Sequence, residues 1–227
     1  LVYGRPGMGK TTLRLAAEAS LRSESRRALF VTYRLGPDAG RLSTLADHFD
    51  PLVRALTIDL FIQIVEKFDV IGPPPDREKT RLLATLIAGS DVQLDTIIAK
   101  LQGGVEPSRV WGYAKEWLSQ DRPYVRPVNR SGPLDAWLDD LTTELAAVEP
   151  ANLCPAERWQ LAVAAAHAWK FPVIFIAVDG VDTQERDVGR MMAMIKPLLA
   201  AAAEFEQQRI YLKCFLPAEL YTPIAKR

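Results

Sequence analysis

The sequence is poor in the residues that several common kinds of protein need. It has two cysteines, Cys154 and Cys214, among 227 residues, which excludes a disulfide framework and favours a reducing compartment. Two histidines, His48 and His167, together with these distant cysteines offer no zinc-binding spacing. A catalytic metal would therefore need oxygen ligands.

The chain also lacks long apolar runs and an excess of either charge. The longest apolar runs, such as 173–178, are far shorter than the roughly 20 residues that cross a bilayer, so we expect no membrane span. The 28 basic side chains balance the 28 acidic ones, which argues against a protein that coats nucleic acid. Arginines over 109–130 are interleaved with acids and prolines, and we interpret them as a solvated face. We expect a cytoplasmic protein, and nothing in the sequence indicates a nucleic-acid partner.

What is present is a set of short apolar runs that alternate with helical patterns. The runs do not alternate apolar with polar residues, which predicts strands covered on both faces, as in a parallel sheet. The expected elements are strands over 1–3, 28–33, 173–178 and 210–216 and helices over 11–22 and 186–205. Pro197 should bend the last helix, and Thr57 is expected to cap a helix over 58–68. This order indicates an α/β fold.

The middle of the chain has a different pattern. Glycine and prolines at 72–76 interrupt the secondary structure, and mostly helical segments follow up to residue 170. The expected helices cover 77–89, 91–102, 107–120, 134–147 and 155–170. All the tryptophans fall here, and we interpret them chiefly as core or helix-packing residues. They are Trp111, Trp117, Trp137, Trp159 and Trp169.

A complete phosphate-binding motif stands at the start of the chain. Residues 4–11 read Gly-Arg-Pro-Gly-Met-Gly-Lys-Thr and match G-x-x-x-x-G-K-[ST], between a predicted strand and a predicted helix. The glycines let successive N–H groups point at phosphate oxygens, and the positive end of the helix adds to the field. Lys10 would reach the β- and γ-phosphates, and the Thr11 hydroxyl would ligate Mg²⁺. The expected nucleotide-binding residues are Gly4, Arg5, Pro6, Gly7, Met8, Gly9, Lys10, Thr11 and Thr12.

An apolar strand that ends in aspartate supplies the second element of such a site. The run 173–178 leads into Asp179, which would hold Mg²⁺ through water, so Thr11 and Asp179 are the expected metal residues. Asp182 is expected to orient the attacking water, although Asp-Gly-Val-Asp also suits a turn before a helix. Two carboxylates this close need a nearby cation. The expected catalytic residues are Lys10, Asp179 and Asp182.

These two motifs resemble a known family. Gly-x-Pro-Gly-x-Gly-Lys-Thr-Thr-Leu at 4–13 and Val-Asp-Gly-Val-Asp at 178–182 look like the STAND class of signalling P-loop NTPases, with NACHT the closest branch and KAP-type ATPases as near relatives. The resemblance implies a three-layer P-loop fold, ATP and Mg²⁺ as ligands, and slow ATP hydrolysis that works as a signalling, defence or assembly switch. It also implies protein partners, or self-assembly, through flanking domains.

The chain departs from that family pattern at several places. A long insertion separates Lys10 from Asp179, and Thr183 stands where NACHT sequences carry a further acid, which disfavours fast hydrolysis. Lys213 is the substitute for a sensor arginine near the end of the fourth strand. The candidates for an arginine finger are Arg34, Arg186 and Arg190.

We therefore expect one interrupted domain, cut from a longer protein because the chain opens at Leu1 on the motif itself. Its parts are the first half of the P-loop core over 1–71, a helical insertion over 72–170, and the second half over 171–227, which ends before any lid. Two other functions stay open: an AAA+-type motor acting on DNA or protein, and a non-hydrolysing scaffold that recruits partners through the insertion. The motor would need glutamate directly after Asp179, where Gly180 stands.

Overall fold

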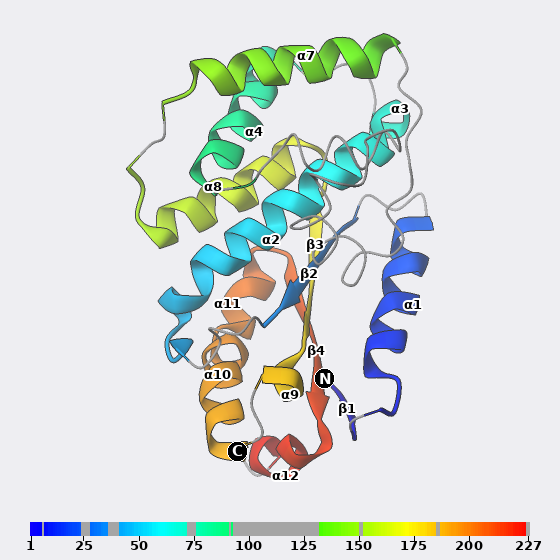
Figure 1. Cartoon of the computed structure of the whole chain (residues 1–227), viewed down its shortest axis with the longest axis vertical. Coiled ribbons are helices and arrows are strands. Elements are labelled where there is room, and N and C mark those ends of the chain that lie inside the picture. Colours follow the sequence, from blue (N-terminus) through cyan, green and yellow to red (C-terminus); the bar gives the residue numbers. More distant parts are fainter. Residues whose placement is uncertain are drawn as a thin grey trace, which may run out of the picture. The chain divides into compact units, whose positions relative to one another are not determined.

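The chain folds into two compact units, one built on a sheet and one of helices. The computed structural model (Figure 1) describes residues 1–5, 7–23, 28–35, 41–71, 76–90, 92, 132–149, 152–184 and 187–225. The sheet unit comprises Leu1–Leu52 and Phe171–Arg227, and the helical unit comprises Val53–Lys170. Within the described residues, no helix is long and apolar enough to span a membrane.

The elements of the sheet unit alternate between strand and helix along the chain. They are β1 (Val2–Gly4), α1 (Lys10–Ser23), β2 (Ala28–Arg34), the start of α2 (Leu45–Glu66), β3 (Val173–Asp179), α9 (Val181–Gln184), α10 (Val188–Ala200), α11 (Ala202–Gln207), β4 (Ile210–Pro217), the short 3-10 helix η3 (Ala218–Leu220) and α12 (Tyr221–Ala225). The strands pair in the order β1-β4-β3-β2, and every pairing is parallel. This confirms the predicted α/β class and parallel sheet.

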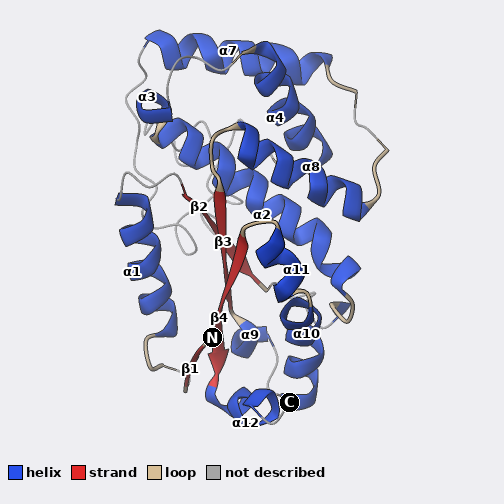
Figure 2. Ribbon diagram, turned by 180° about the vertical axis from the view of Figure 1, so that it is seen from behind, coloured by secondary structure: helices blue, strands red, loops and turns tan. Residues whose placement is uncertain are grey.

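Both faces of the sheet carry helices, as the unbroken apolar runs require. Figures 1 and 2 show α1 on one side of the strands and α10 and α11 on the other. In β2, every residue before Arg34 is buried. Because the strands are parallel, Gly4 at the end of β1, Arg34 at the end of β2 and Asp179 at the end of β3 all face the same edge of the sheet. That edge is where open α/β sheets bind ligands.

Two sequence predictions about helices are wrong. Thr57 does not cap a helix: α2 begins at Leu45, and the Thr57 hydroxyl donates a hydrogen bond to the Val53 carbonyl from inside it (2.8 Å). The last predicted helix is two helices, α10 and α11, separated at Ala201, which lies one turn beyond Pro197. The Ala201 N–H still donates to the Pro197 carbonyl (3.1 Å), so the helical hydrogen bonding continues for one turn after the proline. The helix then breaks at Ala201.

The helical unit holds most of α2 together with α3 (Phe68–Ile71), α4 (Arg77–Gly89), α7 (Gly132–Ala147) and α8 (Pro155–Ala168). Trp137 is buried at its centre: its ring stacks on Phe61 and meets Trp169 edge-on, and its N–H donates to the Thr80 hydroxyl (3.2 Å). Trp159 is also buried. The predicted packing role holds for these three tryptophans, whereas Trp111, Trp117 and the helices expected over 91–102 and 107–120 fall outside the described residues.

The boundary between the units differs from the one expected after residue 71. The contacts separate the units after Leu52, inside α2, so the residues from Val53 onward belong with the helical unit. The physical reason is that α2 continues without a break to Glu66. It brings Phe61 to Trp137 in the helical unit.

The sheet unit contains a buried tyrosine–histidine pair. His48 of α2 is fully buried, and its Nδ1 lies 2.8 Å from the Tyr33 hydroxyl. Burial lowers the pKa of His48 below 6.5, although the Met194 backbone and Asp47 oppose the shift. Burial likewise raises the pKa of Tyr33 above its ordinary value. Both side chains are therefore neutral in the fold at neutral pH.

We predict that the free energy of unfolding falls as pH drops from about 7.5 to about 5. The unfolded chain takes up a proton on His48 near pH 6.5, and the folded chain does so only at lower pH, so stability is present above 6.5 and lost below it. Urea unfolding of wild type and His48→Gln should show a steeper fall for wild type. Tyr33→Phe removes the hydrogen bond but keeps the burial, and should retain the pH dependence. Equal slopes for wild type and His48→Gln would contradict this account.

Candidate phosphate-binding site

The loop between β1 and α1 has the backbone form that its glycines permit. Gly7 has φ of 79° and Gly9 has φ of 78°, in the left-handed region that other residues avoid. The Met8 N–H bonds the Arg5 carbonyl (3.1 Å), which closes the turn, and the Leu13 N–H bonds the Gly9 carbonyl as α1 begins. The first turn of α1 holds no acidic residue, so the positive end of the helix is not offset there. Pro6 lies outside the described residues.

Lys10 is held over this loop by three acceptors. Its ammonium donates to the Gly4 carbonyl (2.9 Å), to the Arg5 carbonyl (3.3 Å) and to the Asp182 carboxylate (2.9 Å). A lysine ammonium has three donors, so each of them is engaged. Lys10 and Asp182 thus form an ion pair, with both side chains largely shielded from solvent.

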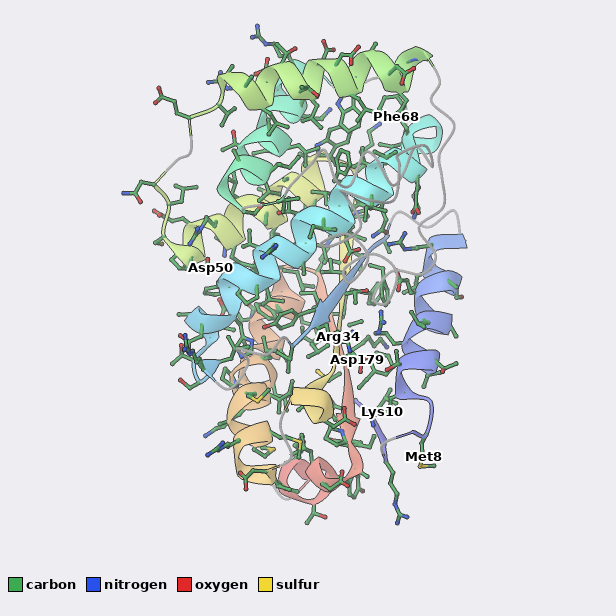
Figure 3. The ribbon with its side chains drawn as sticks, in the orientation of Figure 1. Met8, Lys10, Arg34, Asp50, Phe68 and Asp179 are labelled. Atoms are coloured by element: carbon green, nitrogen blue, oxygen red, sulfur yellow. The ribbon has the colours of Figure 1, made fainter. Side chains whose placement is uncertain are left out.

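Asp179, at the end of β3, is joined to the first turn of α1. The Thr11 hydroxyl donates to Asp179 Oδ2 (3.1 Å), and the Gly180 N–H donates to Asp179 Oδ1 (2.9 Å). Because the hydroxyl gives its proton to the carboxylate, the Thr11 oxygen keeps lone pairs directed elsewhere, as a metal ligand must. In Figure 3, Asp179 and Lys10 lie together between α1 and the strands.

The oxygen donors at this point suit Mg²⁺ bound with a phosphate ligand. Among the described residues, no group of three or more histidine, cysteine or acidic side chains lies close enough to hold a metal alone. Mg²⁺ generally keeps several waters and takes one or two carboxylates together with substrate phosphates. The Thr11 hydroxyl and the Asp179 carboxylate match that demand.

The structure also shows charged residues that the sequence analysis missed. Arg14 is 1% exposed, and its Nε lies 3.1 Å from Asp179 Oδ2. Its Nη1 donates to the Thr32 hydroxyl (3.2 Å) and to Glu18 (3.4 Å), which is fully buried. Arg22 forms an ion pair with the other oxygen of Glu18 (3.1 Å). The signal in the sequence was the four-residue spacing of Arg14, Glu18 and Arg22, which places them on one helix face.

The remaining predicted loop residues lie at the surface. Arg5 and Thr12 are exposed, and Met8 is 70% exposed. Figure 3 shows the Met8 side chain pointing away from Lys10 and Asp179. Arg5 nevertheless takes part through its carbonyl, which accepts from Lys10 and from the Met8 N–H. These residues would therefore meet a phosphate through their backbone.

The candidates for a sensor or an arginine finger are spread over the sheet unit. Arg34 faces Asp179 in register across β2 and β3. Arg190 is exposed in the first turn of α10, and Arg186 lies outside the described residues. Lys213 pairs with Ala177 within β4, well before that strand ends at Pro217, so it does not lie at the strand end where a sensor was expected. Of the candidates that the structure describes, Arg34 is the one at the end of the sheet that holds Asp179.

The backbone form of the loop gives a direct test. We expect Gly7→Ala to lower the midpoint of thermal unfolding and to weaken phosphate binding, because a left-handed alanine costs about 1–2 kcal/mol. An added Cβ at Gly7 would meet nothing within 4 Å, so the strain is purely conformational. Gly89→Ala, at the end of α4 and equally unobstructed, is the matched control and should not lower the midpoint. An unchanged Gly7→Ala protein would contradict the loop geometry.

Comparison with known proteins adds no relative on which to base an assignment. No family model, no curated protein and no solved structure matches this chain.

Proposed function

We propose that this chain is an ATP-binding, Mg²⁺-dependent NTPase module of the P-loop type, similar to STAND and NACHT proteins. The observation that carries the proposal is the Thr11–Asp179 hydrogen bond. It connects a glycine loop of the phosphate-binding form to an acid at the end of a buried parallel strand. A glycine turn that merely capped a helix would have no reason to contact that acid.

In this proposal the loop and Lys10 bind the triphosphate. Backbone N–H groups of the loop and the start of α1 surround the phosphates. The Lys10 ammonium then exchanges some of its present acceptors, Gly4 and Arg5 carbonyls and Asp182, for phosphate oxygens. Mg²⁺, held by Thr11 and Asp179, would neutralise charge that develops on the phosphates.

In this proposal Asp182 has one role before nucleotide binds and another afterwards. Its ion pair with Lys10 makes it the counter-ion of that lysine before nucleotide binds. Once Lys10 turns to phosphate, the released carboxylate would be free to orient water for attack in line with the leaving group. Hydrolysis would then loosen the contacts around the loop and switch the protein between resting and assembled states.

A non-hydrolysing nucleotide-binding scaffold is the second candidate, and one observation favours it. The residue after Asp179 is Gly180, with φ of 83°. No acid stands at that place to activate water, and any residue with a side chain would be strained there. The same residue argues against a motor of the AAA+ type, which would need glutamate at this position.

The central test is nucleotide binding and turnover. Lys10→Met should weaken ATP binding by about tenfold or more, since a charge-assisted contact to phosphate is worth roughly 1.5–3 kcal/mol. Asp179→Asn should bind ATP but lose hydrolysis. Calorimetry and steady-state phosphate release measure the two effects. Unchanged ATP affinity in Lys10→Met would refute the phosphate-binding role, and equal turnover in Asp179→Asn would refute the catalytic one.

Asp182→Asn distinguishes the switch from the scaffold. If Asp182 orients water, ATP binding should tighten slightly because Lys10 loses its competing counter-ion, and turnover should fall by about 10²-fold or more. A scaffold shows the tighter binding with no turnover in either protein. Binding that weakens in Asp182→Asn would contradict the counter-ion role.

A further inference from the structure

Charged side chains, rather than apolar ones, form the buried face of α1. Among its described side chains, the buried ones are Lys10, Arg14 and Glu18, whereas Leu13 is 51% exposed. Burying ionised groups is costly unless each one is paired. Such a face therefore needs a reason beyond helix packing.

The buried charges form a chain that ends on Asp179. Arg22 pairs with Glu18 (3.1 Å), Glu18 with Arg14 (3.4 Å), and Arg14 with Asp179 (3.1 Å). The Thr32 hydroxyl on β2 holds the same guanidinium. Two positive and two negative groups alternate, so the chain as a whole is neutral.

Arg14 occupies part of the carboxylate that a metal would use. A carboxylate has about four lone-pair sites. Thr11 and Arg14 both donate to Asp179 Oδ2, and the Gly180 N–H donates to Oδ1. The described residues thus fill three of about four sites, and the guanidinium charge lies directly against the oxygen that Thr11 shares.

Resting on the proposed nucleotide site, we propose that Arg14 is a positioning residue that competes with the divalent cation for Asp179, so that nucleotide binding depends little on Mg²⁺. The guanidinium supplies positive charge beside Asp179, where the cation would otherwise supply it, and it lowers the gain from adding a divalent cation there. It also helps to fix the orientation of the carboxylate, because Arg14 donates to the same oxygen, Oδ2, as Thr11. Hydrolysis still needs Mg²⁺, so binding and turnover should differ in their metal dependence.

Three variants separate the Arg14 contact from the net charge. Arg14→Met removes the contact and leaves the chain with one extra negative charge. Arg22→Met makes the same change in charge but keeps the contact with Asp179. The double variant Arg14→Met/Glu18→Gln removes the contact and keeps the charge balanced, and it also avoids a partly unpaired Glu18 if the single variant fails to fold.

The first readout is the affinity for Mn²⁺ alone, followed by electron paramagnetic resonance. Arg14→Met and the double variant should bind Mn²⁺ roughly tenfold more tightly than wild type, since a like charge a few ångströms away is removed. Arg22→Met should stay within about twofold of wild type, because its charge lies farther along the chain. Adding Asp179→Asn to the double variant should remove the gain, which assigns the ion to this carboxylate.

The second readout is the ratio of ATP dissociation constants measured in EDTA and in Mg²⁺. We expect a ratio below about threefold for wild type and about tenfold for the double variant, because Mg²⁺ then supplies charge that Arg14 no longer does. Arg14→Lys, which keeps the charge, should restore a low ratio.

The outcomes distinguish this proposal from the proposed function. Equal Mn²⁺ affinity in wild type and in the double variant would overturn the role of Arg14, as would an Arg22→Met protein that behaves like Arg14→Met. If no protein in the set binds ATP, the nucleotide function fails, while the Mn²⁺ titration still decides whether Arg14 competes for Asp179.

Discussion

The site depends on the compensation of one buried carboxylate. Asp179 is 6% exposed at the end of a buried strand, where an ionised group without partners would be very costly. Thr11, Arg14 and Gly180 supply its donors. Arg14 is buried in turn and pairs with Glu18, and Glu18 is balanced by Arg22, whose side chain is also largely shielded from solvent. One acid on β3 thus accounts for the buried charges of α1 from Arg14 to Arg22.

The strands and the glycine loop of the sheet unit could be predicted from the sequence because each depends mainly on neighbouring residues. Unbroken apolar runs become strands covered on both faces, and the glycines of the loop adopt the positive φ that the motif demands. The pairing of Lys10 with Asp182 and of Thr11 with Asp179 follows from the parallel topology, which brings a loop after β1 and an acid after β3 to one edge.

Two features could not be predicted from the sequence: the residue at which α2 begins and the burial of Arg14. Thr57 looked like a helix cap, yet the cap lies earlier: the Thr44 hydroxyl accepts from the Asp47 N–H (3.3 Å), and Asp47 accepts from the Thr44 N–H (2.8 Å). This reciprocal capping starts the helix at Leu45, so Thr57 lies inside it and bonds back to Val53. Arg14 was overlooked because arginine is usually at the surface. Only the acid on a distant strand makes its burial favourable.

A charged interface makes α1 respond to the site in a way that an apolar one would not. Apolar contacts depend on area and are indifferent to a charge bound nearby. Ion pairs in a shielded setting depend on every neighbouring charge, because little solvent screens them. A cation or phosphate bound at Thr11 and Asp179 would therefore change the forces on Arg14, which lies directly against Asp179. The helix that follows the glycine loop is thus held to the sheet partly by ion pairs that would respond to a charge bound at that loop.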